Sequence, residues 1–146
     1  MKFSEIGEES WPDLQPYLDT CFLPLSGLTG EESPWDATEK IARTGEWLVP
    51  LEQAFRGRTV TMPAYHYNGL DNGRAAAINR LIRNCRSAGF RYVVVVSGHP
   101  LRLDEPLEAD LVVQPESDDE QPEAAGIGKS VADLWRKPSS APPSAV

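Results

Sequence analysis

The chain places histidine, serine and tyrosine side chains directly after its most apolar segments. An uninterrupted run of aromatic and β-branched residues, Tyr92–Val96, ends in Ser97, Gly98 and His99. A strand of this composition is typical of a parallel sheet that is covered on both faces, and such sheets bind ligands beyond the carboxyl ends of their strands. We therefore expect Ser97 and His99 to lie at a ligand site.

Further polar residues follow the other predicted strands. Ser26 comes after the apolar segment 20–25, and the loop after segment 58–62 holds two tyrosines and a histidine together. Asp36 stands near the start of a long predicted helix. The sequence thus predicts a candidate pocket that is formed by Ser26, Asp36, Tyr65, His66, Tyr67, Ser97 and His99.

Metal binding is one chemistry that these residues could support. Histidine and aspartate are ligands for zinc or manganese, but such a centre takes three or four N or O ligands from the protein. Asp36 and His99 supply two, and Glu31, Glu32 or His66 would complete a set only if their loops folded inward. Asp36 has a second role open to it as a helix N-cap, and His99 as a cap of its strand. We expect no bound metal and no cofactor.

Other catalytic patterns do not match. The loop after segment 20–25 lacks the lysine of a phosphate-binding loop and the dinucleotide-binding fingerprint. Ser97 does not stand in the G-x-S-x-G context of a nucleophile elbow. The sequence therefore predicts no catalytic residue.

Strands and helices alternate along the chain. The patterns predict strands at 20–25, 58–62, 92–96 and 110–114, and helices at 11–18, from Ser33 or Asp36 to Phe55, and at 74–88. This alternation predicts an α/β fold, with a parallel sheet flanked by helices in a Rossmann-like three-layer core or in two layers, and with strand 92–96 central. Pro24 predicts that the first strand leaves the sheet near its end, and Pro50 predicts a kink or break in the second helix. We place this domain at residues 1–115.

Residues 116–146 are predicted to form an acidic linker and tail. The stretch 115–128 is acidic and lacks aromatic residues, and 138–146 is rich in Pro, Ser and Ala, so both are expected to be disordered. Between them, residues 130–136 are predicted as a short helix with Val131, Leu134 and Trp135 on one side. We expect this helix to pack on its own domain, on a second copy of the chain or on a protein partner.

Charge is segregated along the chain, whose formal net charge is −8. Residues 53–102 hold eight arginines and one acid, whereas residues 103–123 hold nine acids and no base, so the acidic segment either lies across the arginines or is solvated. The overall acidity argues against nucleic-acid binding, and no apolar run is long enough for membrane insertion. Without a signal-peptide pattern, we expect a cytoplasmic protein in which Cys21 and Cys85 are buried free thiols.

Four short motifs resemble the creatininase-type amidohydrolases, namely Phe22–Gly27, Ser33–Thr38, Thr61–Tyr65 and Val96–Pro100. The resemblance implies a creatininase-like fold and a two-metal site in which Asp36 and His99 correspond to ligands. The Glu-x-His of that family is absent, because the corresponding loop 27–33 has no histidine, and Leu101 replaces a further carboxylate. As a whole, the chain resembles the small YpiF-like family of bacterial proteins, which implies no established activity.

These observations predict a non-catalytic binding or accessory protein, a pseudoenzyme with a degenerate creatininase-like crevice. One alternative is a metal-dependent hydrolase of a small amide, with zinc or manganese held by Asp36 and His99. Another is a small-molecule sensor whose pocket is formed by Tyr65, His66, Tyr67 and His99.

Overall fold

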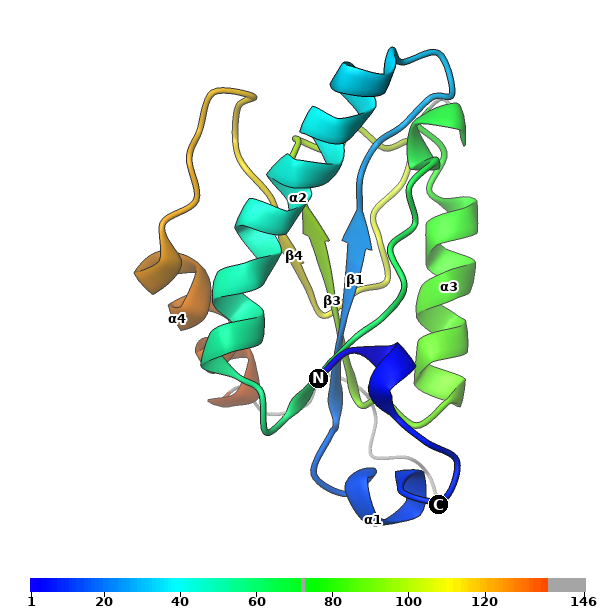
Figure 1. The fold of residues 1–146 in the computed structure, drawn as a ribbon, viewed down its shortest axis with the longest axis vertical. Coiled ribbons are helices and arrows are strands. Elements are labelled where there is room, and N and C mark those ends of the chain that lie inside the picture. Colours follow the sequence, from blue (N-terminus) through cyan, green and yellow to red (C-terminus); the bar gives the residue numbers. More distant parts are fainter. Residues whose placement is uncertain (72, 137–146) are drawn as a thin grey trace.

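The computed structural model describes residues 1–71 and 73–136 (Figure 1). The disorder predicted at 138–146 falls outside these residues. Strands and helices follow one another in this order: the 3-10 helix η1 (Phe3–Glu5), α1 (Trp11–Leu14), β1 (Thr20–Leu25), α2 (Pro34–Ala54), β2 (Thr59–Thr61), the 3-10 helix η2 (Asn68–Asp71), α3 (Ala76–Ser87), β3 (Tyr92–Ser97), β4 (Leu111–Val113) and α4 (Ala124–Arg136). The predicted α/β class is confirmed.

The four strands form one parallel sheet in the order β2-β1-β3-β4. β1 and β3 pair along their whole length, from Thr20 opposite Tyr92 to Leu25 opposite Ser97. Every residue of both strands is buried, which explains why both are apolar runs without alternation. Because β2 lies on one side of β1 and β3 on the other, the topological switch point of the sheet lies between β1 and β3.

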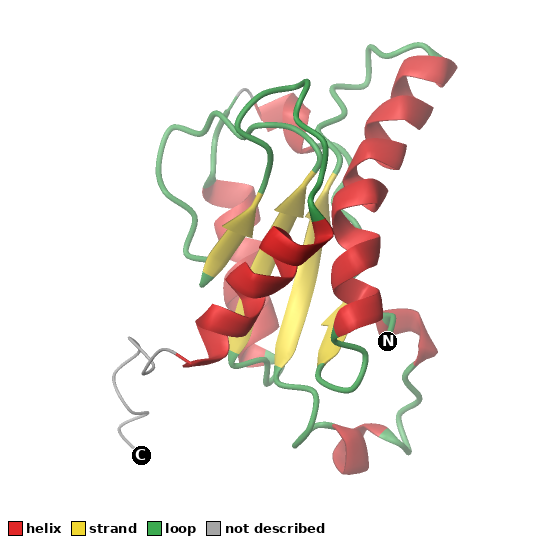
Figure 2. Cartoon of the chain, turned by 90° about the vertical axis from the view of Figure 1, so that its left-hand side faces the viewer, coloured by secondary structure: helices red, strands yellow, loops and turns green. Residues whose placement is uncertain are grey.

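Helices cover both faces of the sheet. In Figure 2, α4 crosses in front of the strands and α3 lies behind them. The face that carries Phe22, Val94 and Val96 packs against α2 and α4. The opposite face packs against α3 through Ile78 and Ile82. Since successive residues of a strand point to opposite faces, β1 and β3 each contribute to both cores, and the layers are helix, sheet and helix.

Neither Pro24 nor Pro50 ends the element in which it stands, so β1 does not leave the sheet at Pro24 and α2 is not broken at Pro50. Pro24 stays in β1, opposite Val96 of β3, and only the ladder between β1 and β2 ends early. The carbonyl of Pro24 accepts from the Tyr65 N–H on the β2 side, so the missing N–H of the proline also faces that side. Pro50 lies near the end of α2, which continues past it to Ala54.

Helices α1, α3 and α4 differ from their predicted bounds, whereas α2 follows one of its two predicted starts. α1 ends at Leu14, shortly before Pro16. α2 begins at Pro34, and Ser33 is its N-cap, because the Ser33 side chain accepts from the Asp36 N–H (3.2 Å). α4 begins at Ala124, ahead of the predicted start at 130. The part of the acidic segment that precedes α4, residues 116–123, is called the acidic strap below.

The C-terminal helix α4 packs on its own domain. Ile127 and Val131 are buried in the core beneath α2. Trp135 Nε1 donates to Thr20 Oγ1 (2.9 Å), and the indole meets the Phe55 ring edge-to-face at 4.9 Å between centroids. The Arg58 guanidinium lies 4.1 Å from the centre of the same indole. No helix among the described residues has both the length and the apolar character that crossing a membrane requires.

The acids that reach the arginines of α3 come from the segment before β4. Arg83 pairs with Glu108 (2.7 Å) and Arg86 with Asp110 (2.9 Å). The acidic strap instead lies beside α2, on the other side of the sheet, where Arg43 Nη2 contacts the Glu120 carbonyl. Of the two alternatives for the acidic segment 103–123, contact with the arginines of residues 53–102 therefore holds for Glu108 and Asp110 but not for the strap.

The sheet has two different edges. Beyond β2, the Thr61 N–H donates to the Met1 carbonyl (2.8 Å), and the Met1 ammonium donates to the Thr59 carbonyl (3.2 Å). Met1 and Lys2 thus extend the sheet next to β2. The other edge is β4, which has three residues.

The two cysteines lie in the core between the sheet and α3. Both are free and buried, as predicted. A hydrogen bond with the Cys85 thiol, together with burial, raises the pKa of the Cys21 thiol far above its ordinary value, so Cys21 stays protonated.

Candidate functional site

The Thr44 hydroxyl of α2 closes the switch point between β1 and β3. Thr44 Oγ1 donates to the Leu25 carbonyl (2.8 Å) and accepts from the Gly98 N–H (3.2 Å). Because Leu25 pairs with Ser97, the next rung of a regular parallel ladder would join these two backbone groups directly. The threonine replaces that rung, and the position at which α/β sheets commonly bind ligands is filled by protein.

Gly98 permits this close approach of α2. A Cβ atom at position 98 would lie 2.5 Å from the Thr44 nitrogen and 2.6 Å from the Arg43 carbonyl carbon, so no side chain fits there. The turn after β3 is thus a packing site for α2. This contact divides the carboxyl ends of the strands into a β2 side, which holds Ser26, and a β4 side, which holds His99.

On the β2 side, the structure brings Ser26 and His66 together. A hydrogen bond of 2.8 Å joins Ser26 Oγ and His66 Nδ1. The loop that carries His66 is held against the end of β1, because the Tyr65 N–H donates to the Pro24 carbonyl (2.9 Å) and the Leu28 N–H to the His66 carbonyl (2.7 Å). Three residues of the predicted pocket, Ser26, Tyr65 and His66, therefore lie at this strand end.

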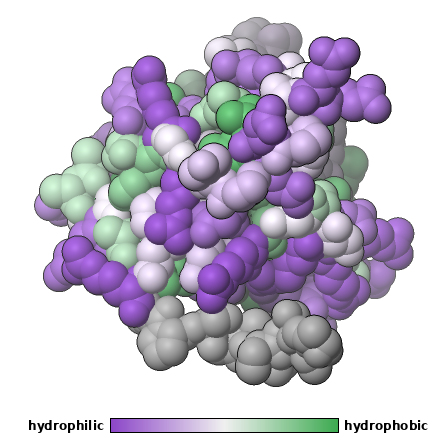
Figure 3. Space-filling view, turned by 90° about the horizontal axis from the view of Figure 1, so that it is seen from below, coloured by the Kyte–Doolittle hydropathy of each residue, from purple (hydrophilic) through white to green (hydrophobic). Residues whose placement is uncertain are grey.

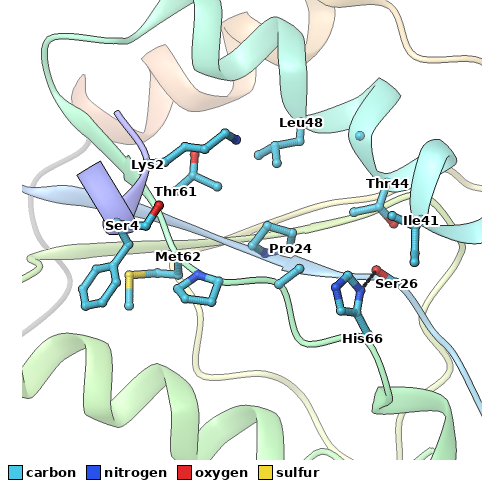
Figure 4. Close-up of a pocket in the computed structure, with 14 residues that line it drawn as sticks. Lys2, Ser4, Pro24, Ser26, Ile41, Thr44, Leu48, Thr61, Met62 and His66 are labelled. Carbon is cyan, nitrogen blue, oxygen red and sulfur yellow. Dashed lines mark hydrogen bonds between the residues drawn. The ribbon is translucent and has the colours of Figure 1, made fainter. Parts of the chain in front are cut away.

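A cavity of about 370 Å³ opens beside this pair, between α2 and the N-terminal segment (Figure 4). Figure 4 shows Ser26, His66 and Thr44 at one end of it and Lys2, Ser4 and Thr61 at the other. The remaining side chains of the lining are apolar: Phe3, Pro24, Ile41, Leu48, Met62, Pro63 and Ala64. The ladder between β1 and β2 ends at Phe22 and Thr61, and the divergence of the chain beyond it leaves room for the cavity.

Ser26 is not arranged as a nucleophile for acyl transfer. Such a nucleophile needs backbone N–H donors free to bind the oxyanion of the transition state. The nearest donors are engaged, since the Ser26 N–H donates to the Tyr65 carbonyl (3.2 Å) and the Gly27 N–H to Asn68 Oδ1 (2.6 Å). The Leu28 N–H is held by the His66 carbonyl. The pair therefore gives the cavity a hydrogen-bonding wall.

On the β4 side, Ser97 and His99 form a tight turn. Ser97 Oγ donates to the His99 carbonyl (2.6 Å) and accepts from the His99 N–H (3.1 Å). His99 Nδ1 lies 3.6 Å from Asp118 Oδ1 of the acidic strap. Burial, and next the positive charge of Arg43, lower the pKa of His99 below its ordinary value, so the imidazole is neutral at pH 7.

Asp36 and Tyr67 join neither group. Asp36 is exposed in the first turn of α2, eight residues before Thr44, which places it about 12 Å along the helix axis from the contact with Gly98. Tyr67 is half exposed. The described residues contain no group of three or more His, Cys, Asp or Glu side chains that could hold a metal ion. The residues present therefore do not fit the two-metal centre that the creatininase resemblance implies.

Glu32, which the sequence offers as an additional ligand, is held by its own loop. Its carboxylate accepts from the Thr29 N–H (2.8 Å), the Gly30 N–H (2.9 Å) and Lys40 Nζ (2.8 Å). The hydrogen bond from Lys40, followed by that from the Thr29 backbone, holds the pKa of Glu32 well below its ordinary value. Glu31 is exposed.

Sequence reasoning missed Thr44, Arg43 and Lys2. Thr44 carries a usable signal, because it shares the helical spacing of Trp47, Leu48 and Leu51, the buried residues of α2. A threonine on an apolar face buries a hydroxyl, and a buried hydroxyl requires partners. Arg43 and Lys2 carry no comparable signal.

The opposite end of the molecule, at the amino ends of the strands, has a mainly polar surface. In Figure 3, polar residues cover most of this face, and apolar residues show in small areas between them.

Fold and site together define a three-layer α/β protein with the strand order β2-β1-β3-β4 and a ligand-sized cavity beside the carboxyl end of β1. The chain belongs to a family described as "Protein of unknown function (DUF2487)", whose sequence profile matches residues 9–115. This match spans α1 to β4 and ends before α4. Neither a curated protein nor a solved structure matches the chain.

Proposed function

We propose that the protein is a non-catalytic binding protein that takes a small, largely apolar molecule into the cavity beside Ser26 and His66. The observation that carries the proposal is the cavity itself. Its volume of about 370 Å³ falls within the range of small-molecule sites, and an apolar wall with a few convergent polar groups is typical of them.

The lining indicates the kind of ligand. The Ser26–His66 pair offers a hydrogen-bonding group at one end, and Pro24, Leu48 and Met62 offer apolar contact in the middle. Lys2, at the far end, is paired with Glu52 (3.1 Å) and so does not bring an unbalanced charge. An uncharged molecule with an apolar body and one hydrogen-bonding group fits these features best.

The binding role is the one that the sequence predicts, but the proposed site differs from the predicted pocket. The pocket uses Ser26 and His66 from the predicted set, and it adds the α2 residues Ile41, Thr44 and Leu48. The alternative of a metal-dependent amidohydrolase has less support, because its two candidate ligands, Asp36 and His99, do not converge.

The experiment is an NMR titration with benzamide and indole, two apolar molecules that carry a hydrogen-bonding group. We expect saturable shifts at the amides of Ser26, Thr44, Leu48 and Met62. The blocking variant is Gly45→Leu, because Gly45 lines the cavity and a side chain there meets open space.

The matched control is Gly128→Leu, which also adds a side chain at a helical glycine facing open space, but in α4. Binding to the wild type and to Gly128→Leu, with none to Gly45→Leu, supports the proposal. Equal binding by all three proteins, or binding by none of them, contradicts it.

A further inference from the structure

The Nε–Nη2 edge of the Arg43 guanidinium has no hydrogen-bond acceptor at an ordinary distance among the described residues. Arg43 Nε is buried and has no hydrogen-bond partner among the described residues. Arg43 Nη2, on the same edge, has a long contact of 3.5 Å to the Glu120 carbonyl. Two parallel donors on one edge of a guanidinium match the two oxygens of a carboxylate or phosphate. Because arginine keeps its protons, the buried Nε–H is a donor without an acceptor.

A second nitrogen in the same situation belongs to His99. His99 Nε2 is buried and also has no hydrogen-bond partner among the described residues. The positive charge of Arg43 is one of the causes that lower the pKa of this imidazole. Gly98, next to His99 in the chain, packs on the Arg43 backbone without a side chain between them. Buried polar atoms in proteins almost always have hydrogen-bond partners. Two buried nitrogens without partners beside the carboxyl end of β3 therefore indicate a place that binds a ligand.

The acidic strap covers these groups loosely. Asp118 lies 3.6 Å from His99 Nδ1, and its side chain is 74% exposed. This contact and the 3.5 Å contact of Glu120 both exceed ordinary hydrogen-bond lengths. Open grooves border the strap, one between Gln121–Pro122 and α2, and one between Glu120 and β4. Figure 1 shows the strap as the segment that leaves β4, rises, and returns to α4.

We propose that Arg43 and His99 form a binding site for a small oxyanion, a phosphate monoester or a carboxylate, and that Asp118 of the acidic strap competes with this ligand. The Nε–Nη2 edge of Arg43 binds two ligand oxygens. Once Asp118 has left Nδ1, the neutral His99 imidazole carries its proton on Nε2, which then acts as a further donor. The strap carries five acids and no base, so it repels anions that do not make these specific contacts. The site lies on the β4 side of Thr44 and is independent of the cavity proposed above.

The test is a pair of NMR titrations, one with inorganic phosphate and one with malonate, at constant ionic strength set with sodium chloride. The readout is the amide shift of Gly98 and His99 in the full-length protein. We compare the wild type with Asp118→Asn and with Asp119→Asn, which removes the same charge from the neighbouring strap residue. Arg43→Gln removes the guanidinium, and Arg56→Gln is its matched control, at an exposed arginine in the turn after α2.

We expect at least one of the two anions to bind, and the arm that responds identifies the ligand class. Asp118→Asn should bind it about two- to fivefold tighter than the wild type, which is what an exposed ion pair contributes when a ligand must displace it. Asp119→Asn and Arg56→Gln should match the wild type, and Arg43→Gln should lose saturable binding.

Three results would overturn the proposal: equal affinity in the two aspartate variants, saturable binding retained in Arg43→Gln, or shifts that sodium chloride alone reproduces. If Arg43→Gln does not fold, the comparison of Asp118→Asn with Asp119→Asn still decides, because both changes lie on the exposed strap.

Discussion

We expect the single hydroxyl group of Thr44 to contribute strongly to the free energy of unfolding. Replacing Thr44 by Val keeps the shape of the side chain and removes only the hydroxyl. The Leu25 carbonyl then loses a donor and the Gly98 N–H loses an acceptor, in a region where both groups are buried. Each group left without its partner costs about 1–3 kcal/mol, so we expect Thr44→Val to lower the free energy of unfolding by about 2–6 kcal/mol.

Thr44→Ser is the matched control. It keeps both hydrogen bonds and loses one methyl group, which costs about 1 kcal/mol in a packed core. The measurement is urea unfolding followed by tryptophan fluorescence, with Trp47 one turn from the substitution. Hydrogen exchange of the Gly98 amide gives a local readout, and we expect its protection to fall in Thr44→Val and to persist in Thr44→Ser.

A specific result would refute this reasoning. If β1 and β3 close in the valine variant, the Gly98 N–H bonds directly to the Leu25 carbonyl and the regular ladder extends by one rung. The free energies of unfolding of Thr44→Val and Thr44→Ser would then differ by less than about 0.5 kcal/mol, which is typical of a neutral substitution. The Gly98 amide would also stay protected from hydrogen exchange. That outcome would show that the hydroxyl fills space at the switch point without holding the strands.

For other substitutions, we expect a change of stated direction in stability, which standard unfolding measurements can check. Gly98→Ala should lower the free energy of unfolding by roughly 2 kcal/mol or more, because its Cβ meets the α2 backbone. Gly45→Ala lies in a helix interior with open space around it and should raise the free energy of unfolding by about 0.5–1 kcal/mol. Changes of the same sign in the two variants would contradict this packing of Gly98 on α2. Trp135→Ala should cost roughly 2–3 kcal/mol through the lost contacts with Phe55, and truncation after Gln114 should lower Tm further; a truncated chain with the wild-type Tm would be evidence against α4 as part of the core. Because the pKa of Glu32 is lowered in the folded protein, its stabilising effect is present above the ordinary carboxyl pKa of about 4.3 and is lost as pH falls below that value. The drop in Tm from pH 7 to pH 3 should therefore be smaller in Glu32→Gln than in the wild type, and an equal drop would disprove this assignment.

The fold was largely predictable because the chain's strongest patterns are local. The run Tyr92–Val96 has the composition of a strand that is covered on both faces, and the segments 36–55 and 74–88 have the apolar spacing of helices. The start of α4 at Ala124 was not predictable from local pattern, since Gly126 and Gly128 are poor helix formers and acids precede them. What stabilises this part of α4 is the burial of Ile127 and Val131 against α2 and the sheet, which is a tertiary effect.

The candidate site was predictable only in part. Strand ends identified Ser26 and His99 as residues at the carboxyl edge of the sheet. They did not show that α2 would separate the two, because the insertion of Thr44 depends on the absence of a side chain at Gly98. The partnership of Ser26 with His66 joins residues 40 positions apart and depends on how the loop after β2 folds back.

The edges of the sheet bear on how the protein behaves at high concentration. An open strand edge exposes backbone donors and acceptors that can pair with the edge of another molecule, which is a common route to aggregation. Here the hydrogen bonds of Met1 with Thr59 and Thr61 occupy the free side of β2, and the opposite edge has only the three residues of β4. Neither edge offers a long ladder for intermolecular β-pairing. We therefore expect edge-to-edge pairing of the sheet to contribute little to aggregation at high concentration.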